Sequence, residues 1–136
     1  MTELGSAWTV LAARDGADEE TCRKVLQVLS RIGDKWSLLV IGTLRDGTMR
    51  FGQLHREVTG ISQRMLTLTL RQLERDGLVS RTVHPSVPPK VEYALTELGS
   101  TLLGTVLQLA GWAADHVEEI DENRRRYDAG LNRAGE

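Results

Sequence analysis

Four polar residues between positions 63 and 71 are spaced so that they would share one face of a helix: Gln63, Arg64, Thr67 and Arg71. Offsets of one, four and eight residues return to the same side of a helix with about 3.6 residues per turn. The face is rich in hydrogen-bond donors and carries no carboxylate. Gln and Arg can form paired hydrogen bonds with the edges of adenine and guanine, and a Thr methyl group can contact thymine. These residue types therefore predict a surface that reads base edges in DNA.

The segment 50–76 is predicted to hold this face within a helix-turn-helix. Apolar residues recur at helical intervals on both sides of a break at 59–61, and they are Phe51, Leu54, Val58, Leu66, Leu70 and Leu73. Ser62 is expected to cap the second helix, because its hydroxyl can accept a hydrogen bond from a free backbone N–H. We also assign Ser62 to the DNA contacts, since it lies at the N-terminal end of the second helix, the end that usually meets the major groove. Gly77 is expected to end the helix.

Residues 78–95 are predicted to form a β-hairpin, the wing. The segments 78–83 and 90–95 are rich in β-branched residues, and the second alternates apolar and polar side chains. All three prolines, Pro85, Pro88 and Pro89, lie between these segments, where a missing N–H removes no ladder hydrogen bond. A hairpin after a helix-turn-helix predicts a winged helix-turn-helix, a mainly α fold with a small β-hairpin wing.

Further basic residues near these elements are assigned to the DNA backbone. Arg50, Arg71 and Arg81 are expected to contact phosphates, and Lys90 in the wing is expected to contact the backbone or the minor groove. Residues 45–90 hold eight basic and four acidic side chains, whereas residues 91–136 hold four basic and nine acidic ones. The net charge of −2 therefore does not exclude DNA, because binding depends on the contacted phosphates and distant charges are screened within about 10 Å.

Helices are also predicted over residues 18–32 and 35–45 and, after the wing, over 96–122. The last helix carries two apolar stripes, so we expect it to pack on its own domain and on the same helix of a second copy. The residues assigned to this homodimer interface are Trp8, Leu102, Leu103, Val106, Leu109 and Trp112. Residues 18–122 thus form one winged-helix domain.

The two ends of the chain are treated as additions to that domain. Residues 1–17 are expected to contain a short amphipathic helix, which either covers the second stripe of the last helix or clasps the dimer. Residues 123–136 are expected to be a charged, frayed tail.

The order of motifs along residues 22–115 resembles the HxlR-type family of bacterial transcription regulators, which are related in architecture to the MarR group. The motifs that carry the resemblance are Cys22, Lys35-Trp36, RFG (50–52), GISQRML (60–66), LERDGLVSR (73–81) and VEYALT (91–96). Arg23 departs from the pattern, since a proline often stands there in the family. The resemblance implies a homodimeric regulator that binds an inverted repeat in double-stranded promoter DNA, with repression as the expected effect.

Cys22 is the only cysteine, which excludes an intrachain disulfide and a metal site built on thiolates. Its neighbours Arg23 and Lys24 would favour the reactive thiolate, and the resemblance implies that this residue is a redox or electrophile sensor. The alternative is that Cys22 is a small buried hydrophobic residue.

The sequence gives no support for an enzyme. Three histidines, His55, His84 and His116, lack the spacing of metal ligands, and no nucleophile elbow or phosphate-binding loop is found. No metal or cofactor is expected. A pocket for a small-molecule effector between the dimer helices, lined by Trp36, Tyr93 and Trp112, is one hypothesis, and ordinary core packing of these rings is its alternative.

Residues 1–136 contain no apolar run that approaches the roughly 20 residues of a membrane span, and the chain does not begin like a signal peptide. We therefore expect no membrane partner and a cytoplasmic location. The alternative to a DNA-binding regulator is a winged helix that serves as a protein-interaction module.

Overall fold

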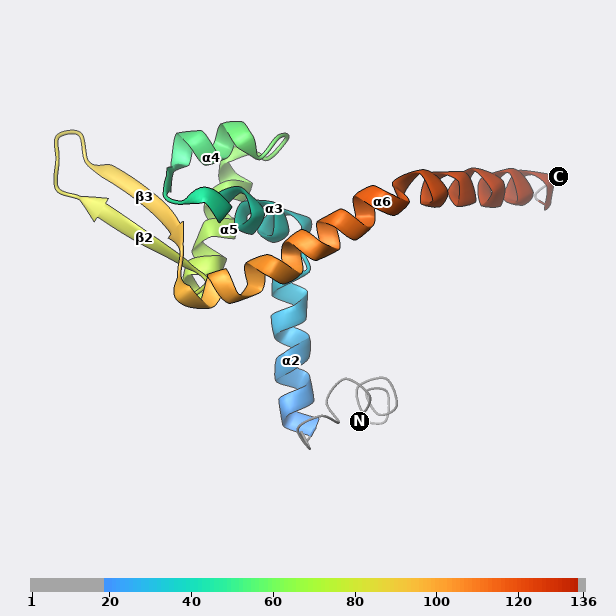
Figure 1. Cartoon of the computed structure of the whole chain (residues 1–136), viewed down its shortest axis with the longest axis horizontal. Helices are drawn as coiled ribbons and strands as arrows, with labels where there is room; N and C mark the ends of the chain where they lie inside the picture. The colour runs from blue at the N-terminus through green and yellow to red at the C-terminus, as the bar shows by residue number, and fades with distance from the viewer. Residues whose placement is uncertain (1–18, 135–136) are drawn as a thin grey trace.

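The computed structural model describes residues 19–134 and shows a small sheet and a group of helices in one body, from which two helices project (Figure 1). The elements are α2 (Glu19–Ile32), α3 (Lys35–Thr43), the 3-10 helix η3 (Leu44–Asp46), β1 (Met49–Arg50), α4 (Phe51–Glu57), α5 (Gln63–Arg75), β2 (Val79–His84), β3 (Lys90–Leu95) and α6 (Glu97–Ala134). The predicted winged helix-turn-helix is confirmed, with α4 and α5 as its two helices.

The core lies where α3, α4 and α5 meet β2 and the first part of α6. Its buried apolar residues are Val40, Ile41, Leu44, Leu54, Val58, Ile61, Leu66, Leu70, Leu73, Leu78, Val79 and Val106. The predicted stripe of α5 is buried as expected, because its apolar residues repeat every three or four positions. The opposite side of α5 is therefore fixed toward solvent.

The end of α5 is fixed by its backbone. Gly77 adopts φ 77°, a left-handed conformation that glycine adopts without a steric penalty. The Leu78 N–H then donates to the Leu73 carbonyl at 2.9 Å. The chain turns directly into β2, so the wing starts at a defined distance from α5.

The sheet has three antiparallel strands in the order β1-β3-β2. The predicted hairpin is present, with its first strand at 79–84 rather than 78–83. Strand β1 is not predicted by the sequence, because two residues are too few to show an alternating pattern. It pairs Met49 with Tyr93 and Arg50 with Glu92, which ties the start of α4 to the wing.

The C-terminal helix is longer than the sequence predicts. We expected it to end near residue 122 and the tail to fray, but α6 continues to Ala134. Glu122 pairs with Arg125 at 2.7 Å and with Arg126 at 3.3 Å, and such pairs one turn apart support a helix that has no apolar stripe. The predicted tail is therefore largely helical. In Figure 1, this half of α6 extends away from the rest of the molecule.

The N-terminal half shows smaller differences. The helix predicted over 35–45 ends at Thr43 and passes into the 3-10 turn at Leu44–Asp46. The first helix begins at Glu19 within the described residues, so the predicted cap at residue 18 and the extension 1–17, with Trp8, lie outside them. No helix in the described part of the chain is long and apolar enough to cross a membrane.

Candidate nucleic-acid interface

The N-terminus of α5 is capped as predicted. Ser62 has an extended backbone, with φ −75° and ψ 157°, and its Oγ accepts a hydrogen bond from the Met65 N–H at 3.0 Å. This bond satisfies one of the free donors in the first turn of the helix. The side chain of Ser62 is thus committed to the helix, although the residue itself is exposed at the tip of the surface.

The three predicted base-reading residues follow Ser62 on the exposed side of α5. Gln63 and Arg64 are exposed, and Thr67 is half-buried. The Thr67 hydroxyl donates to the Gln63 carbonyl at 2.9 Å, so this proton is already used within the helix. The methyl group and the oxygen lone pairs of Thr67 are the parts that remain for a partner.

The turn before α5 is held by a residue that the sequence did not assign to the surface. The His55 Nε2–H donates to the Ile61 carbonyl at 3.0 Å, across the turn that joins α4 to α5. The ring of His55 also stacks on Phe51, with centroids 6.3 Å apart. His55 therefore fixes the chain one residue before the Ser62 cap. In the sequence, the only sign of this role is the position of His55 shortly before the turn.

The predicted phosphate contacts on α5 and on the wing meet at one place. Arg71, Arg81 and Tyr93 line a hollow of about 360 Å³, together with Thr67, Leu70 and Glu74. Arg81 lies opposite Tyr93 in the β2–β3 ladder, and Arg71 approaches from α5. The sequence predicts the two arginines but not Tyr93, because the strand register that brings the phenol to them cannot be read from the chain alone.

The remaining two predicted phosphate contacts lie at the edges of the surface. Arg50 is exposed at the start of α4, where its backbone N–H donates to Gln53 Oε1 at 3.0 Å. Lys90 is exposed at the base of the wing tip and lies opposite His84 in the ladder. His84 is within ion-pair distance of Glu92, so this pair joins the two strands just below the tip.

The cations of this surface share one electrostatic property. Arg50, Arg64, Arg71, Arg81 and Lys90 are all exposed, and among the described residues none of them pairs with a carboxylate. On the projecting helices, by contrast, Arg23, Arg31 and Arg125 each pair with an acid. The five cations assigned to DNA, on α5, at the start of α4 and on the wing, are therefore not neutralised by an ion pair in the described part of the chain.

The residues predicted for a dimer interface are divided by the structure. Val106 is 6% exposed and belongs to the core of its own domain, and Leu102 and Leu103 pack partly against that core. They face inward because the first turns of α6 lie on the domain. Leu109 and Trp112, farther along α6, are 51% and 55% exposed. Among the described residues of the predicted interface, only this later part is free for a partner.

The three aromatic residues of the hypothetical effector pocket do not lie together within one chain. Trp36 and Tyr93 pack against the core, which fits the alternative of ordinary core packing, while Trp112 is exposed on α6 and stacks on His116 with centroids 4.6 Å apart. A pocket between the helices of a dimer stays a hypothesis. Cys22, on α2, is a free thiol and is 8% exposed.

The comparisons with known proteins agree with this fold. The model of the family described as HxlR-like helix-turn-helix matches residues 31–121. An uncharacterised HTH-type transcriptional regulator of Methanothermobacter thermautotrophicus is 46% identical over 111 residues, which are 79% of this chain and 85% of that protein. YdeP of Bacillus subtilis, another uncharacterised regulator of this type, is 45% identical over 105 residues, which are 77% of this chain and 81% of YdeP.

Two solved structures are similar in fold as well as in sequence. The putative transcriptional regulator ytfH from Salmonella typhimurium superposes with a TM-score of 0.70 at 39% identity, covering 74% of this chain and 90% of that one. The redox regulator HypR in its reduced form gives a TM-score of 0.68 at 44% identity, covering 73% of this chain and 98% of HypR.

Proposed function

The chain belongs to the HxlR-like helix-turn-helix family, and from this premise we propose that it is a transcription regulator that binds promoter DNA in a sequence-specific manner. Helix α5 enters the major groove, where Gln63 and Arg64 contact base edges and Thr67 adds an apolar contact. Arg50, Arg71, Arg81 and Lys90 contact the sugar-phosphate backbone on either side.

The observation that carries this proposal is the set of exposed cations without acidic partners. An arginine that already pairs with a carboxylate must lose that pair before it can bind a phosphate. The cations on α5, β2 and β3 have no such pair among the described residues, so they can exchange counterions for phosphates directly. Hydrogen bonds at both ends of α5 hold the surface in shape before DNA arrives.

We infer that the protein acts as a homodimer. Leu109, Trp112 and Val117 are exposed apolar residues on the part of α6 beyond the core, and the same helix of a second copy would cover them. Two heads related by a two-fold axis would read an inverted repeat with half-sites about one helical turn apart. Such a dimer on a promoter would compete with polymerase, which makes repression the expected effect.

A redox signal is the form of control that we propose. HypR, solved in oxidised and reduced forms, is a redox regulator similar to this chain, and Cys22 is the one residue here that such chemistry can use. Because a disulfide needs two thiols, oxidation must join Cys22 to a second chain or to a small thiol. Cys22 is 8% exposed, so the side chains that cover it must move before the thiol can react.

The experiment is a fluorescence anisotropy titration of the purified protein with the DNA that flanks its own gene, and with a shuffled sequence as control. We expect tight binding to the first DNA at low salt, and weaker binding to the shuffled DNA. Diamide should release the wild-type protein but not Cys22→Ser. Binding that diamide does not alter would refute the redox signal alone.

The second candidate function is a winged helix that binds proteins and not DNA. The half-buried Thr67, whose hydroxyl is used within α5, is the observation that favours it, because it leaves few free donors on the middle of the helix. Failure to bind either DNA at low salt would support this candidate and overturn the DNA-binding proposal.

A further inference from the structure

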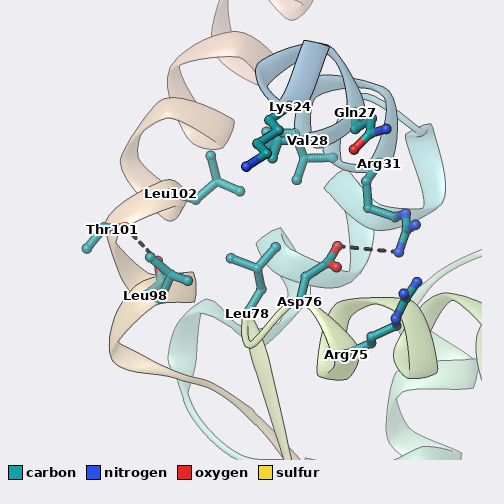
Figure 2. Close-up of a pocket in the computed structure, with 11 residues that line it drawn as sticks. Lys24, Gln27, Val28, Arg31, Arg75, Asp76, Leu78, Leu98, Thr101 and Leu102 are labelled. Atoms are coloured by element: carbon teal, nitrogen blue, oxygen red, sulfur yellow. Dashed lines mark hydrogen bonds and ion pairs between the residues drawn. The ribbon is translucent and has the colours of Figure 1, made fainter. Parts of the chain in front are cut away.

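A hollow lies away from the exposed face of α5, between α2, the end of α5 and the start of α6. It has a volume of about 710 Å³, within the range of small-molecule pockets. Figure 2 shows its lining side chains converging from these three elements. The aromatic residues that the sequence assigned to an effector pocket do not line it.

One side of this hollow is apolar. Val28 and Ile32 come from α2, Leu78 from the turn after α5, and Leu98 and Leu102 from α6. Leu78 is buried, whereas Val28 and Leu98 are 57% and 55% exposed. The floor is therefore part of the core and the walls rise from the two projecting helices. An apolar group in the hollow would remove these walls from water.

The other side is cationic. Arg31 and Arg75 line it together with a single acid, Asp76, whereas Lys24 lies beside Val28 and pairs with Glu20 at 3.7 Å. Arg31 Nη1 lies 3.4 Å from Asp76 Oδ2, and Figure 2 shows Arg75 directed toward the same end of the hollow. No carboxylate in the described part of the chain pairs with Arg75. Two guanidinium groups thus share one carboxylate, which leaves an excess of positive charge at this side of the hollow.

We propose that this hollow binds a small organic anion with an apolar body, such as a medium-chain carboxylate. The apolar body lies against Val28, Leu78 and Leu102, and the carboxylate lies at Arg31 and Arg75. Guanidinium groups bind carboxylates with paired hydrogen bonds. The lining is apolar at one side and cationic at the other, which matches a ligand with an apolar end and an anionic end.

The site is also placed to affect α5. Asp76 is the C-cap residue that directly follows α5, and its pair with Arg31 links the end of that helix to α2. An incoming carboxylate takes Arg31 from Asp76 and so breaks this link. The consequence for DNA rests on the function proposed above, whereas the binding site itself does not.

The first experiment is isothermal titration calorimetry of the full chain with octanoate, and with octanamide as the neutral analogue. Octanoate should bind and octanamide should bind about tenfold more weakly. Arg31→Gln should weaken octanoate about tenfold, and Val28→Glu should abolish binding. Two exposed residues of α2 that do not line the hollow give matched controls, Arg23→Gln and Val25→Glu, which should bind octanoate like the wild type.

Asp76→Asn gives a test with the opposite sign. It removes the acid that competes for Arg31, so octanoate should bind about threefold more tightly. Circular dichroism of each variant establishes that it is folded. Equal binding of octanoate and octanamide would overturn the proposal. Loss of octanoate binding in both control variants would also overturn it, because neither residue lines the hollow. So would the absence of any heat, the result expected if a second copy fills the hollow.

The effect on DNA is measured separately, by anisotropy with and without octanoate. Octanoate should change the DNA affinity of the wild type and leave that of Arg31→Gln unchanged, because the link to Asp76 is already absent. If the protein binds no DNA at all, calorimetry still decides whether the site exists. The two proposals can therefore fail independently.

Discussion

Arg81 and Tyr93 lie opposite each other in the β2–β3 ladder and, with Arg71 from α5, border one hollow of the candidate interface. The wing and α5 thus lie together at a place where two guanidinium groups and a phenol can contact a single phosphate. Because Arg71 and Arg81 belong to different elements, the hollow exists only while the wing holds its position against α5. Phosphate binding in this hollow therefore depends on the position of the wing relative to α5.

The first prediction separates base contacts from phosphate contacts. Arg64→Ala should relax the preference for one base pair by about 1–3 kcal/mol, whereas Arg71→Ala and Lys90→Ala should weaken all sequences alike and lower the salt slope by about one unit. Anisotropy at several salt concentrations, with matched and mismatched DNA, measures both effects. Arg23→Ala serves as the control. The same loss for all three variants would contradict these roles.

The second prediction concerns Tyr93. Tyr93→Phe removes the hydroxyl and keeps the ring that packs against the core, so stability should change little while affinity falls for specific and shuffled DNA equally. Thermal unfolding and anisotropy measure the two quantities. An unchanged affinity would show that the phenol does not reach a phosphate.

The third prediction uses Ser62 to separate helix capping from DNA contact. Ser62→Ala should lower stability by about 1 kcal/mol, because the Met65 N–H loses its acceptor. Ser62→Asp keeps an acceptor and should stay close to the wild type in stability, but its negative charge should weaken DNA binding. Urea unfolding and anisotropy on both variants provide the measurements. Normal DNA affinity in Ser62→Asp would place this residue outside the interface.

The fourth prediction contrasts two glycines of α6. A Cβ at Gly99 would collide with the backbone carbonyl of Leu78, whereas one at Gly104 would have no atom within 4 Å. Gly99→Ala should therefore destabilise the protein by more than about 2 kcal/mol. Gly104→Ala should stabilise it by about 0.5–1 kcal/mol, because alanine is the better helix former. Thermal unfolding decides between these opposite signs, and tolerance of Gly99→Ala would disprove the close contact.

The fifth prediction tests the dimer. Trp112→Ala should raise the dissociation constant of the dimer by about tenfold or more, since exposed aromatic residues contribute strongly to interfaces. Asp121→Ala, an exposed change on the same helix, should leave it unchanged. Analytical ultracentrifugation gives both constants. A wild-type chain that stays monomeric at high concentration would refute the homodimer.

Much of the fold could be predicted from the sequence where the signals are local. The apolar spacing of Leu66, Leu70 and Leu73 predicted both α5 and its buried side, and Ser62 predicted the start of that helix. The exposed positions of Gln63 and Arg64 follow from the same period. These features depend on residues within a few turns of one another, so a single chain is enough to identify them.

The features that could not be predicted depend on residues far apart in the chain. Strand β1 forms only because β3 is present to pair with Met49, and the place of Tyr93 in the candidate site depends on strand register. Arg31 and Asp76 are 45 positions apart, so nothing in the sequence joins them. The end of α6 was misplaced for another reason, because the pairs of Glu122 with Arg125 and Arg126 support the helix past the predicted end.

The Thr96 side chain helps to join the root of α6 to the end of α5. Its hydroxyl donates to the Gly77 carbonyl and accepts from the Gly99 N–H at 3.0 Å. Helix α6 has 38 residues and is therefore about 57 Å long, and its first turns, as far as Val106, pack on the domain. The rest of the helix acts as a lever on this anchored root, so a tilt of a few degrees at the root would move the far end by several ångströms. In the proposed dimer, the spacing of the two DNA-binding surfaces would then depend on residues at the root of α6 that touch no base.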